Sequence, residues 1–299
     1  MKRLFFLASI IFFPIAIWTE NSMAEDTIKI GYMICNDLKE TSGRFDPLTN
    51  FLSQKLGRKF EAVYLNTYEI EDVFRDKKID FVHANSVIYI ILKENYNAKL
   101  ILGEKSGTGG KDSAGIIIVR NDSDIKTVSG LKNKRFVFGP SFSTDGFYCV
   151  YDLLKQNGLD PEIDLGYYAI PFGSFKHDKV LYAVYYKAFD AGAARLDDVK
   201  DAVKEKKFEP GDFRIIAKSE MVPYCTLAAR KEIDDGLIKQ VKNVLLGLKP
   251  DDTGIDANGE RLLVLKRGWI DGFVEVNDKD YDILRKMAKR AELPPYEKY

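Results

Sequence analysis

Strand-like and helix-like segments alternate along this chain, and that alternation limits the possible folds more than any other feature of the sequence. From Ile28 onward, short runs rich in β-branched and aromatic residues are each followed by an amphipathic run. Such alternation is typical of an α/β protein with a largely parallel sheet and helices on both faces. In the first hundred residues we expect strands at 28–34, 60–65, 79–84 and 100–102, and helices at 46–56, 68–77 and 86–95.

The pattern is interrupted by the glycine-rich run Ser106–Gly110 and restarts at Gly115. The run Tyr224–Ala229 then predicts a strand that returns to the first unit, and the tail from Asp234 is mostly helical, ending in a helix at 280–290. Between these points we expect strands at 115–119, 135–139, 167–170, 189–193 and 213–217, and helices at 144–156, 177–186 and 196–205.

This order predicts two α/β lobes joined by two strand crossings. We expect lobe 1 to comprise residues 25–112 and 223–299, and lobe 2 to comprise residues 113–222. In such folds a ligand binds in the cleft between the lobes, at the carboxyl ends of parallel strands and the N-termini of helices. The architecture predicts the place of a site and leaves its ligand open.

The first 24 residues have the features of a secretory signal. Lys2 and Arg3 precede the apolar run Leu4–Trp18, and Ser22-Met23-Ala24 places small residues where signal peptidase cuts. We expect cleavage after Ala24 and a soluble, exported, periplasmic protein. A retained N-terminal anchor is the alternative, although the apolar run is shorter than the roughly 20 residues that span a bilayer.

Charge and motif content exclude several classes of function. The chain has 45 basic and 45 acidic residues, so it lacks the excess positive charge of a general nucleic-acid or anionic-membrane binder. The run Gly139–Ser143 departs by one residue from a hydrolase nucleophile elbow, and the run from Gly107 to Lys111 lacks the spacing of a phosphate-binding P-loop. With no zinc-binding or Cys-x-x-Cys motif either, we expect no enzyme activity, no cofactor and no metal.

The most informative local run is Phe138–Gly146, which predicts a strand followed by a hydroxyl-rich loop that opens a helix. Free backbone amides at a helix N-terminus, together with the hydroxyls of Ser141, Ser143 and Thr144, can bind an anion. Simple capping of the helix by Ser143 or Ser141 is also compatible with this run, and the two roles do not exclude each other.

Several collinear motifs resemble those of the phosphonate-, phosphite- and phosphate-binding subunits of ABC importers. Together they cover essentially all of the chain after the signal segment. The resemblance implies a type II periplasmic binding protein: two α/β lobes with a ligand cleft and a two-strand hinge. It rests on Phe45-Asp46-Pro47-Leu48 through Gly57, Ile79–Val82 with Tyr89, Ser123–Lys126 with Leu131–Phe136, Phe138–Gly146, Phe189–Ala193, and Gly272–Val274 with Asp278 and Tyr281.

The resemblance also implies ligand residues. Ser143 and Thr144 match the family's anion-binding loop, and His177 resembles its histidine, although Phe175 and Lys176 separate His177 from the Gly-Ser that normally precedes it. Asp190 resembles the acidic residue that meets the far end of the ligand. From lobe 1 we expect the cleft to be lined by a further set, which comprises Tyr32, His83, Asn85, Ser86 and Tyr89.

Asp145 departs from the family pattern, because a small hydroxyl residue is usual at that position. A carboxylate there is favourable at a helix N-terminus. If it faces the ligand, it accepts hydrogen bonds and repels a dianion, which favours a ligand that keeps a proton or carries an amine. Monohydrogen phosphate, phosphite, arsenate, neutral arsenous acid and aminophosphonates all meet that condition, whereas a simple alkylphosphonate is less favoured.

The three cysteines, Cys35, Cys149 and Cys225, exclude a disulfide scaffold and permit at most one bridge. They are expected to be small buried hydrophobic residues. Contact with a thiophilic ligand such as arsenite is the alternative, because the family that this chain resembles includes sensors of arsenic oxyanions.

Two functions follow from the resemblance. In the first, a monomer captures a small oxyanion by closing its cleft and delivers it to the membrane permease of an ABC importer. In the second, the protein senses phosphate, phosphite, arsenate or arsenite, and its partner is the periplasmic domain of a histidine kinase. The sequence does not separate them, since both functions use the same cleft.

Overall fold

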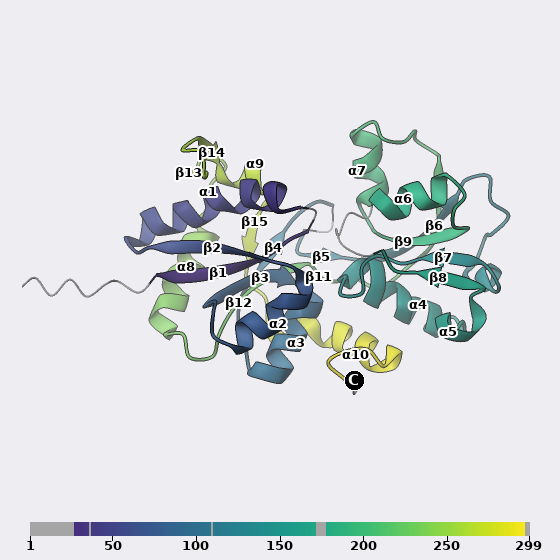
Figure 1. The fold of residues 1–299 in the computed structure, drawn as a ribbon, viewed down its shortest axis with the longest axis horizontal. Helices are drawn as coiled ribbons and strands as arrows, with labels where there is room; N and C mark the ends of the chain where they lie inside the picture. Colours follow the sequence, from purple (N-terminus) through teal and green to yellow (C-terminus); the bar gives the residue numbers. More distant parts are fainter. Residues whose placement is uncertain (1–26, 36, 109, 172–177, 297–299) are drawn as a thin grey trace, which may run out of the picture.

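The computed structural model describes residues 27–296, except for residues 36, 109 and 172–177. The expected signal segment and the expected ligand residue His177 lie outside the described residues. Two sheets, each covered by helices, form two lobes that lie side by side (Figure 1). In the part of the chain that is described, no helix is both long enough and apolar enough to cross a membrane.

Lobe 1 is built on a six-stranded mixed sheet of order β15-β4-β12-β3-β1-β2. Strands β1, β2 and β3 are parallel to one another, whereas β12 is antiparallel to both its neighbours and β15 is antiparallel to β4. The strands are β1 (Ile28–Met33), β2 (Phe60–Leu65), β3 (Phe81–Asn85), β4 (Lys99–Lys105), β12 (Cys225–Ala229) and β15 (Gly272–Val274). The helices are α1 (Leu38–Leu56), α2 (Thr67–Arg75), α3 (Ser86–Tyr96), α8 (Asp235–Leu246) and α9 (Val264–Gly268), and a small hairpin, β13 (Thr253–Ile255) with β14 (Arg261–Leu263), packs on α1.

Lobe 2 is built on a five-stranded sheet of order β10-β6-β9-β7-β8. Its strands are β6 (Gly115–Arg120), β7 (Arg135–Val137), β8 (Tyr167–Ala169), β9 (Ala191–Arg195) and β10 (Phe213–Lys218). Its helices are the 3-10 turn η1 (Val128–Leu131), the π-helical segment η2 (Thr144–Cys149), α4 (Val150–Gln156), α5 (Pro161–Asp164), α6 (Asp178–Tyr185) and α7 (Asp198–Lys204). The strand that the sequence predicts at 189–193 is β9, which begins two residues later, so Asp190 precedes the strand.

The chain passes between the two sheets through two short strands that pair with each other. These are β5 (Asp112–Ser113) and β11 (Val222–Pro223), which are antiparallel. The hydroxyl of Ser86, at the start of α3, donates to the backbone carbonyls of Pro223 and Tyr224. The Ser86 side chain thus holds the end of β11, where the chain returns from lobe 2, against lobe 1.

The first helix begins earlier than the sequence predicts. We expected it to open at Asp46 with Pro47 in its first turn, but α1 begins at Leu38 with Asp37 as its N-cap and contains Pro47 in its interior. Proline has no N–H to donate to the carbonyl four residues earlier. That carbonyl belongs to Gly43, and it accepts from Arg267 Nε at 2.9 Å instead. A side chain contact from α9 therefore replaces the lost helical hydrogen bond.

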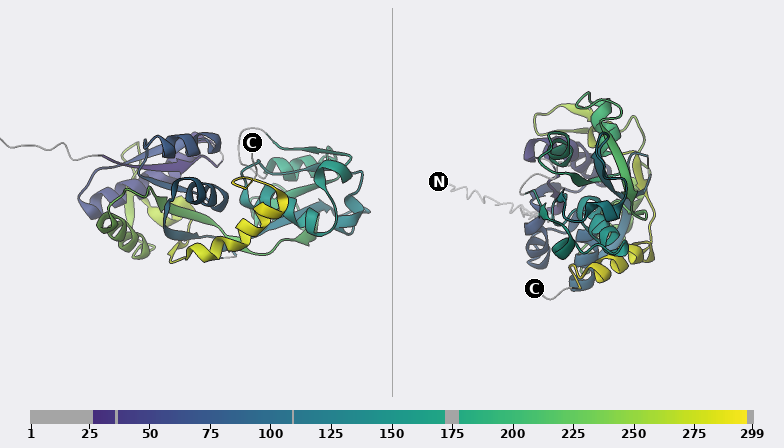
Figure 2. Two further views of the ribbon diagram at one scale, coloured as in Figure 1. Left: turned by 90° about the horizontal axis from the view of Figure 1, so that it is seen from below. Right: turned by 90° about the vertical axis from the view of Figure 1, so that its right-hand side faces the viewer.

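The last part of the chain bridges the two lobes. The 3-10 turn η3 (Asp278–Tyr281) lies against lobe 1, and α10 (Asp282–Ala291) packs on η2 and α4 of lobe 2 (Figures 1 and 2). Leu284 and Met287 of α10 belong to one apolar cluster with Val82 of lobe 1 and Ile117 of lobe 2. The lobes therefore share a continuous core here, and a cavity opens between them at a different place.

Candidate ligand cleft

A cavity of about 640 Å³ lies between the lobes. It is formed by the carboxyl ends of β1 and β3, the segment around Tyr224, and the ends of α1 and α9 from lobe 1, and by the helix start at Ser143 and the region after β9 from lobe 2. Its lining residues are Met33, Cys35, Glu40, Arg44, Asn85, Ser106, Gly107, Tyr224, Cys225 and Trp269 on the lobe 1 side, and Ser143, Thr144, Asp145, Asp178, Arg195, Asp198, Asp201, Ala202, Lys204, Glu205 and Lys207 on the lobe 2 side.

The helix start that the sequence singles out lines this cavity. Ser143, Thr144 and Asp145 are all buried, and the Ser143 hydroxyl accepts from the backbone N–H of Gly146 at 3.0 Å. Gly115 of β6 lets this turn lie against the sheet, because a Cβ at that position would lie 2.3 Å from the carbonyl oxygen of Asp145. Capping by Ser143 is therefore present, and the helix start faces the cavity as well.

Two buried polar contacts connect this loop to lobe 1. The side-chain amide of Asn85 donates to the carbonyl of Phe142 at 2.9 Å, and the hydroxyl of Thr144 accepts from the backbone N–H of Val87 at 3.2 Å. Asn85 also caps α3 by accepting from Ile88 N at 3.0 Å. Asn85 is the one residue of the five expected from lobe 1 that lines the cavity.

The other four residues expected from lobe 1 are corrected by the structure, because each side chain is buried away from the cavity. Tyr32 stacks on Phe45 and its hydroxyl is 2.9 Å from that of Thr49. His83 Nε2 lies 2.8 Å from Glu104 Oε2 inside lobe 1. Ser86 donates to the carbonyl of Pro223 in β11, and Tyr89 donates to Asp278 at 2.6 Å. These residues hold lobe 1 together and are not among those that line the cavity.

Asp190 is also misplaced in the sequence-based expectation. It precedes β9 and accepts from the backbone N–H of Arg135 at 2.8 Å and from its guanidinium at 2.9 Å. These bonds lower the pKa of the Asp190 carboxyl. Five residues of strand, about 16 Å, separate it from Arg195, whose end of β9 lines the cavity. Ser141 likewise lies outside the cavity lining, 2.9 Å from the hydroxyl of Tyr68.

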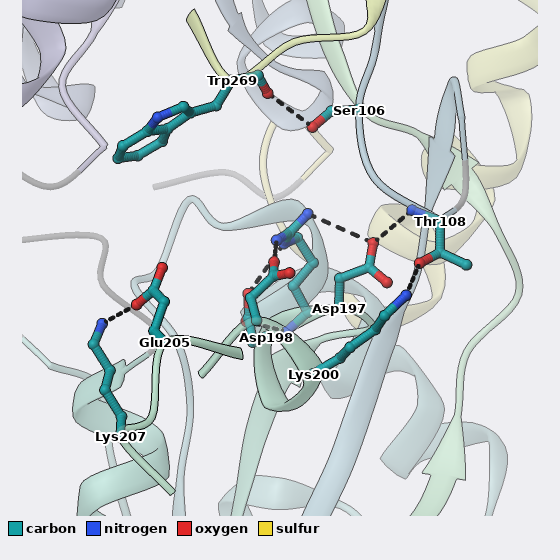
Figure 3. Close-up of polar contacts among 10 residues, drawn as sticks. Ser106, Thr108, Asp197, Asp198, Lys200, Glu205, Lys207 and Trp269 are labelled. Atoms are coloured by element: carbon teal, nitrogen blue, oxygen red, sulfur yellow. Dashed lines mark hydrogen bonds and ion pairs between the residues drawn. The ribbon is translucent and has the colours of Figure 1, made fainter. Parts of the chain in front are cut away.

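Arg195 is a cavity residue that sequence reasoning missed. Its guanidinium donates to Asp198 at 3.0 Å and to Asp201 at 2.9 Å, and it lies 3.9 Å from Asp197. Asp197 in turn accepts from the backbone N–H of Thr108, across from lobe 1, at 3.1 Å (Figure 3). Burial alone would lower the pKa of Arg195, but the surrounding acidic groups raise it above its usual value. Arg195 therefore stays charged, with its charge balanced by its own neighbours.

The cavity as a whole is more acidic than basic. Six of its lining residues carry a carboxyl group and four carry a basic group. Lys207, for example, lies 2.5 Å from Asp178 and 2.6 Å from Glu205 (Figure 3). The charge pattern could have been found in part from the sequence, since Arg195 and Asp198 follow the strand that was expected at 189–193. Tyr224, Cys225 and Trp269 carried no comparable signal.

Two of the three cysteines line the cavity. Cys35 and Cys225 extend from β1 and β12, which are separated in the sheet by β3, and both are free thiols, as is Cys149 in the interior of lobe 2. Burial raises the pKa of all three. The thiols are therefore neutral and weakly nucleophilic at neutral pH. Among the described residues, no three His, Cys, Asp or Glu side chains converge on a common point as metal ligands would.

Comparison with known proteins places the chain in a family. The family model described as "ABC transporter, phosphonate, periplasmic substrate-binding protein" matches residues 30–281. A probable ABC transporter phosphite-binding protein, PhnD1 of Prochlorococcus marinus, is 24% identical over 232 residues, which are 74% of this chain and 77% of that protein. The structure of PhnD1 in complex with methylphosphonate superimposes with a TM-score of 0.73 at 20% identity, covering 88% of this chain and 97% of that one.

A second relative is a longer protein. The tetrathionate sensor histidine kinase TtrS of Salmonella typhimurium is 23% identical over 234 residues, or 73% of this chain, which spans 39% of the length of the kinase. The structural match shows the type II periplasmic binding protein fold, and the family match covers both lobes. The chain therefore belongs to the family of periplasmic substrate-binding proteins of ABC phosphonate transporters.

Proposed function

We propose that this protein captures a small phosphorus oxyanion of the phosphite or phosphonate type and presents it to the permease of an ABC importer. The observation that carries the proposal is the position of the helix start at Ser143. It lines the cavity between the lobes, opposite the strand ends of lobe 1, in a chain of the phosphonate-binding family. Backbone amides and hydroxyls at such a helix start bind tetrahedral oxyanions without any change to the ligand's bonds.

Capture depends on closure of the two lobes. The contacts from Asn85 to Phe142 and from Val87 to Thr144 join the loop before η2 to the start of α3. A ligand that binds the helix start while touching lobe 1 favours the closed arrangement over the open one. The permease then recognises a surface that exists in the closed protein. We propose no chemical reaction on the ligand and no catalytic role for any residue.

The acidic excess of the cavity favours ligands of low negative charge. Six carboxyl groups against four basic groups line the cavity, and one of the carboxyl groups, Asp145, lies at the helix start, so a second negative charge on the ligand is unfavourable. Phosphite and phosphonates bind best as monoanions or, with an amine, as zwitterions. The preference for a ligand of low charge therefore depends on several carboxyl groups and not on Asp145 alone.

Calorimetric titration tests the proposal. The protein is purified after expression of the full chain and titrated with phosphite, methylphosphonate, aminoethylphosphonate, phosphate, arsenate and arsenite. We expect sub-micromolar binding of a phosphorus compound, and loss of that binding in Ser143→Ala. Ser141→Ala is the matched control, because this neighbouring hydroxyl binds Tyr68 and does not line the cavity. Absence of binding across the whole panel would overturn the proposal.

A sensory role is the second candidate, and the likeness to TtrS supports it. In that case the protein reports an oxyanion to the periplasmic domain of a histidine kinase. The same titration, with tetrathionate added to the panel, tests this candidate in one direction, because binding of a phosphorus compound fits both functions. Tight binding of tetrathionate or of an arsenic oxyanion, with weak binding of every phosphorus compound, would favour the sensor and count against the importer.

A further inference from the structure

The cavity has four basic side chains, and they differ in how their charge is balanced. Arg195 is held by Asp198 and Asp201, and Lys207 is held by Asp178 and Glu205. Lys204 is exposed at the rim. Arg44, by contrast, is half-buried, and the described residues form no ion pair with it, although the charge of Glu104 acts on it from a longer distance. The positive charge of Arg44 is therefore available to a ligand, whereas the charges of Arg195 and Lys207 are neutralised by ion pairs with neighbouring carboxylates.

Arg44 is held in place by groups that leave the end of its guanidinium unused. Its Nε donates to the carbonyl of Gly268 at 3.0 Å. The guanidinium carbon lies 4.9 Å from the ring centre of Phe45 and 5.0 Å from that of Trp269, so two aromatic faces fix its orientation. Within the described part of the chain, neither terminal nitrogen of Arg44 has a hydrogen-bond partner. A planar fork with two free nitrogens matches an acid group that presents two oxygens.

Trp269 has an unusual position for a bulky residue. Its backbone has a φ of 57°, in the left-handed region that normally suits glycine, and its side chain is 56% exposed while it lines the cavity. The Ser106 hydroxyl donates to its carbonyl at 3.2 Å (Figure 3). A left-handed conformation is unfavourable for a residue that carries a Cβ. The Trp269 indole is exposed at the cavity and stacks on the Arg44 guanidinium in spite of this unfavourable backbone conformation. This combination points to contact between Trp269 and a ligand.

We propose that Arg44 and Trp269 together form the lobe 1 half of the ligand site. The Arg44 guanidinium binds two oxygens of the anionic head from the side opposite the helix start at Ser143, and the Trp269 indole covers the substituent on that head. The ligand class is then a phosphonate with an organic substituent in preference to bare phosphite. This inference rests on the proposed function, since it assigns the groups that meet the same anion.

The protein provides its own reporter for the test. The chain has two tryptophans, Trp18 and Trp269. In the full chain carrying Trp18→Phe, all tryptophan emission therefore comes from the rim of the cavity. We expect methylphosphonate and aminoethylphosphonate to change this emission with saturation at the calorimetric affinity, and phosphite to change it less. A ligand that binds by calorimetry but leaves the emission unchanged would remove Trp269 from the site.

Arg267 offers a matched control for Arg44. Its Nε donates to the carbonyl of Gly43, so the two arginines make reciprocal bonds between α1 and α9, but Arg267 does not line the cavity. In the Trp18→Phe background we expect Arg44→Gln to weaken methylphosphonate binding about 10- to 100-fold. We expect Arg44→Lys to recover part of the affinity, because it restores the charge without the fork, and Arg267→Gln to change affinity less than about twofold.

The outcomes are distinct. If Arg44→Gln and Arg267→Gln weaken binding equally, Arg44 acts through the α1 to α9 contact and the inference is wrong. If Arg44→Gln and Arg44→Lys both bind normally while Ser143→Ala does not, the inference fails and the proposed function stands. If the parent protein binds no phosphorus compound, the proposed function itself fails. Should Arg44→Gln not fold, Arg44→Lys with its thermal midpoint carries the same comparison.

Discussion

Arg290, in the last helix of the chain, holds the carboxylate of Asp152 in lobe 2 through two hydrogen bonds, Nε to Oδ1 at 2.7 Å and Nη2 to Oδ2 at 2.8 Å. The Asp152 side chain is completely buried, and it lies in α4, the continuation of the helix that starts at Ser143. At the other end of α10, Arg285 binds Glu94 of α3 at 2.9 Å. The helix α10 therefore ties the lobe 2 helix that starts at Ser143 to α3 of lobe 1.

Replacement of Arg290 by glutamine is expected to lower the free energy of unfolding by about 1–3 kcal/mol. The variant leaves the buried Asp152 charge with Gln156 as its remaining side-chain donor. The loss is smaller than for a fully buried pair, because Arg290 itself is half exposed. Urea unfolding measures the change. Lys286→Gln on the exposed face of the same helix is the control, and an equal effect of the two variants would contradict the prediction.

The sequence predicted the fold class because the evidence for it is local and repeated. Alternation of strand and helix patterns requires no knowledge of which elements meet. The errors arose where a distant segment changes a local preference. Pro47 normally marks the first turn of a helix, yet α1 continues through it because Arg267, far along the chain, satisfies Gly43. The bridging position of α10 likewise depends on a contact between distant residues.

In the candidate site, too, the sequence predicts what depends on neighbouring residues and misses what depends on distant ones. Ser143, Thr144 and Asp145 line the cavity, and the sequence singled them out because a strand, a hydroxyl-rich loop and a helix start are adjacent in it. Tyr32 and His83 were misplaced because a strand's pattern shows that side chains alternate between its faces but not which face meets the cleft. Arg44 and Trp269 were missed, since their partnership requires the contact between α1 and α9.

The buried pair of His83 and Glu104 supplies stability and should leave ligand affinity almost unchanged. Both side chains are nearly inaccessible to solvent, with exposures of 6% and 2%. Replacing His83 by glutamine leaves Glu104 without its partner, and we expect the free energy of unfolding to fall by about 2–4 kcal/mol. Adding Glu104→Gln should recover part of that loss.

The affinity of the His83→Gln variant for methylphosphonate, measured well below its thermal midpoint, is expected to stay within about threefold of the parent value, because His83 does not line the cavity. A loss of binding without a loss of stability would show instead that His83 meets the ligand, as the sequence first suggested.

The two cavity cysteines should be unreactive at neutral pH. Burial raises the pKa of Cys35 and, by more, that of Cys225, and the thiolate is the form that reacts. Since a higher pKa means less thiolate at a given pH, iodoacetamide at pH 7.5 should modify both at least about tenfold more slowly than an unfolded cysteine. The rates should still be rising at pH 9. Peptide mapping by mass spectrometry measures them, and all three cysteines should react alike in urea. A rate that levels off below pH 8 would contradict this.

Asn85 allows closure of the lobes to be separated from folding. Asn85→Asp keeps the oxygen that caps α3, and aspartate is as good a cap as asparagine. It loses the N–H that binds the carbonyl of Phe142 and places a negative oxygen against it. We expect its thermal midpoint to stay close to the parent's, while its affinity for methylphosphonate falls about tenfold, because closure costs more and because the cavity lining gains a negative charge. Asn85→Ala loses the cap as well, so its stability should drop by about 1 kcal/mol. Calorimetry gives both affinities, and small-angle scattering with ligand shows whether the Asn85→Asp protein stays more open. Parent-like affinity and compactness in Asn85→Asp would mean that this cross-lobe bond does not contribute to closure.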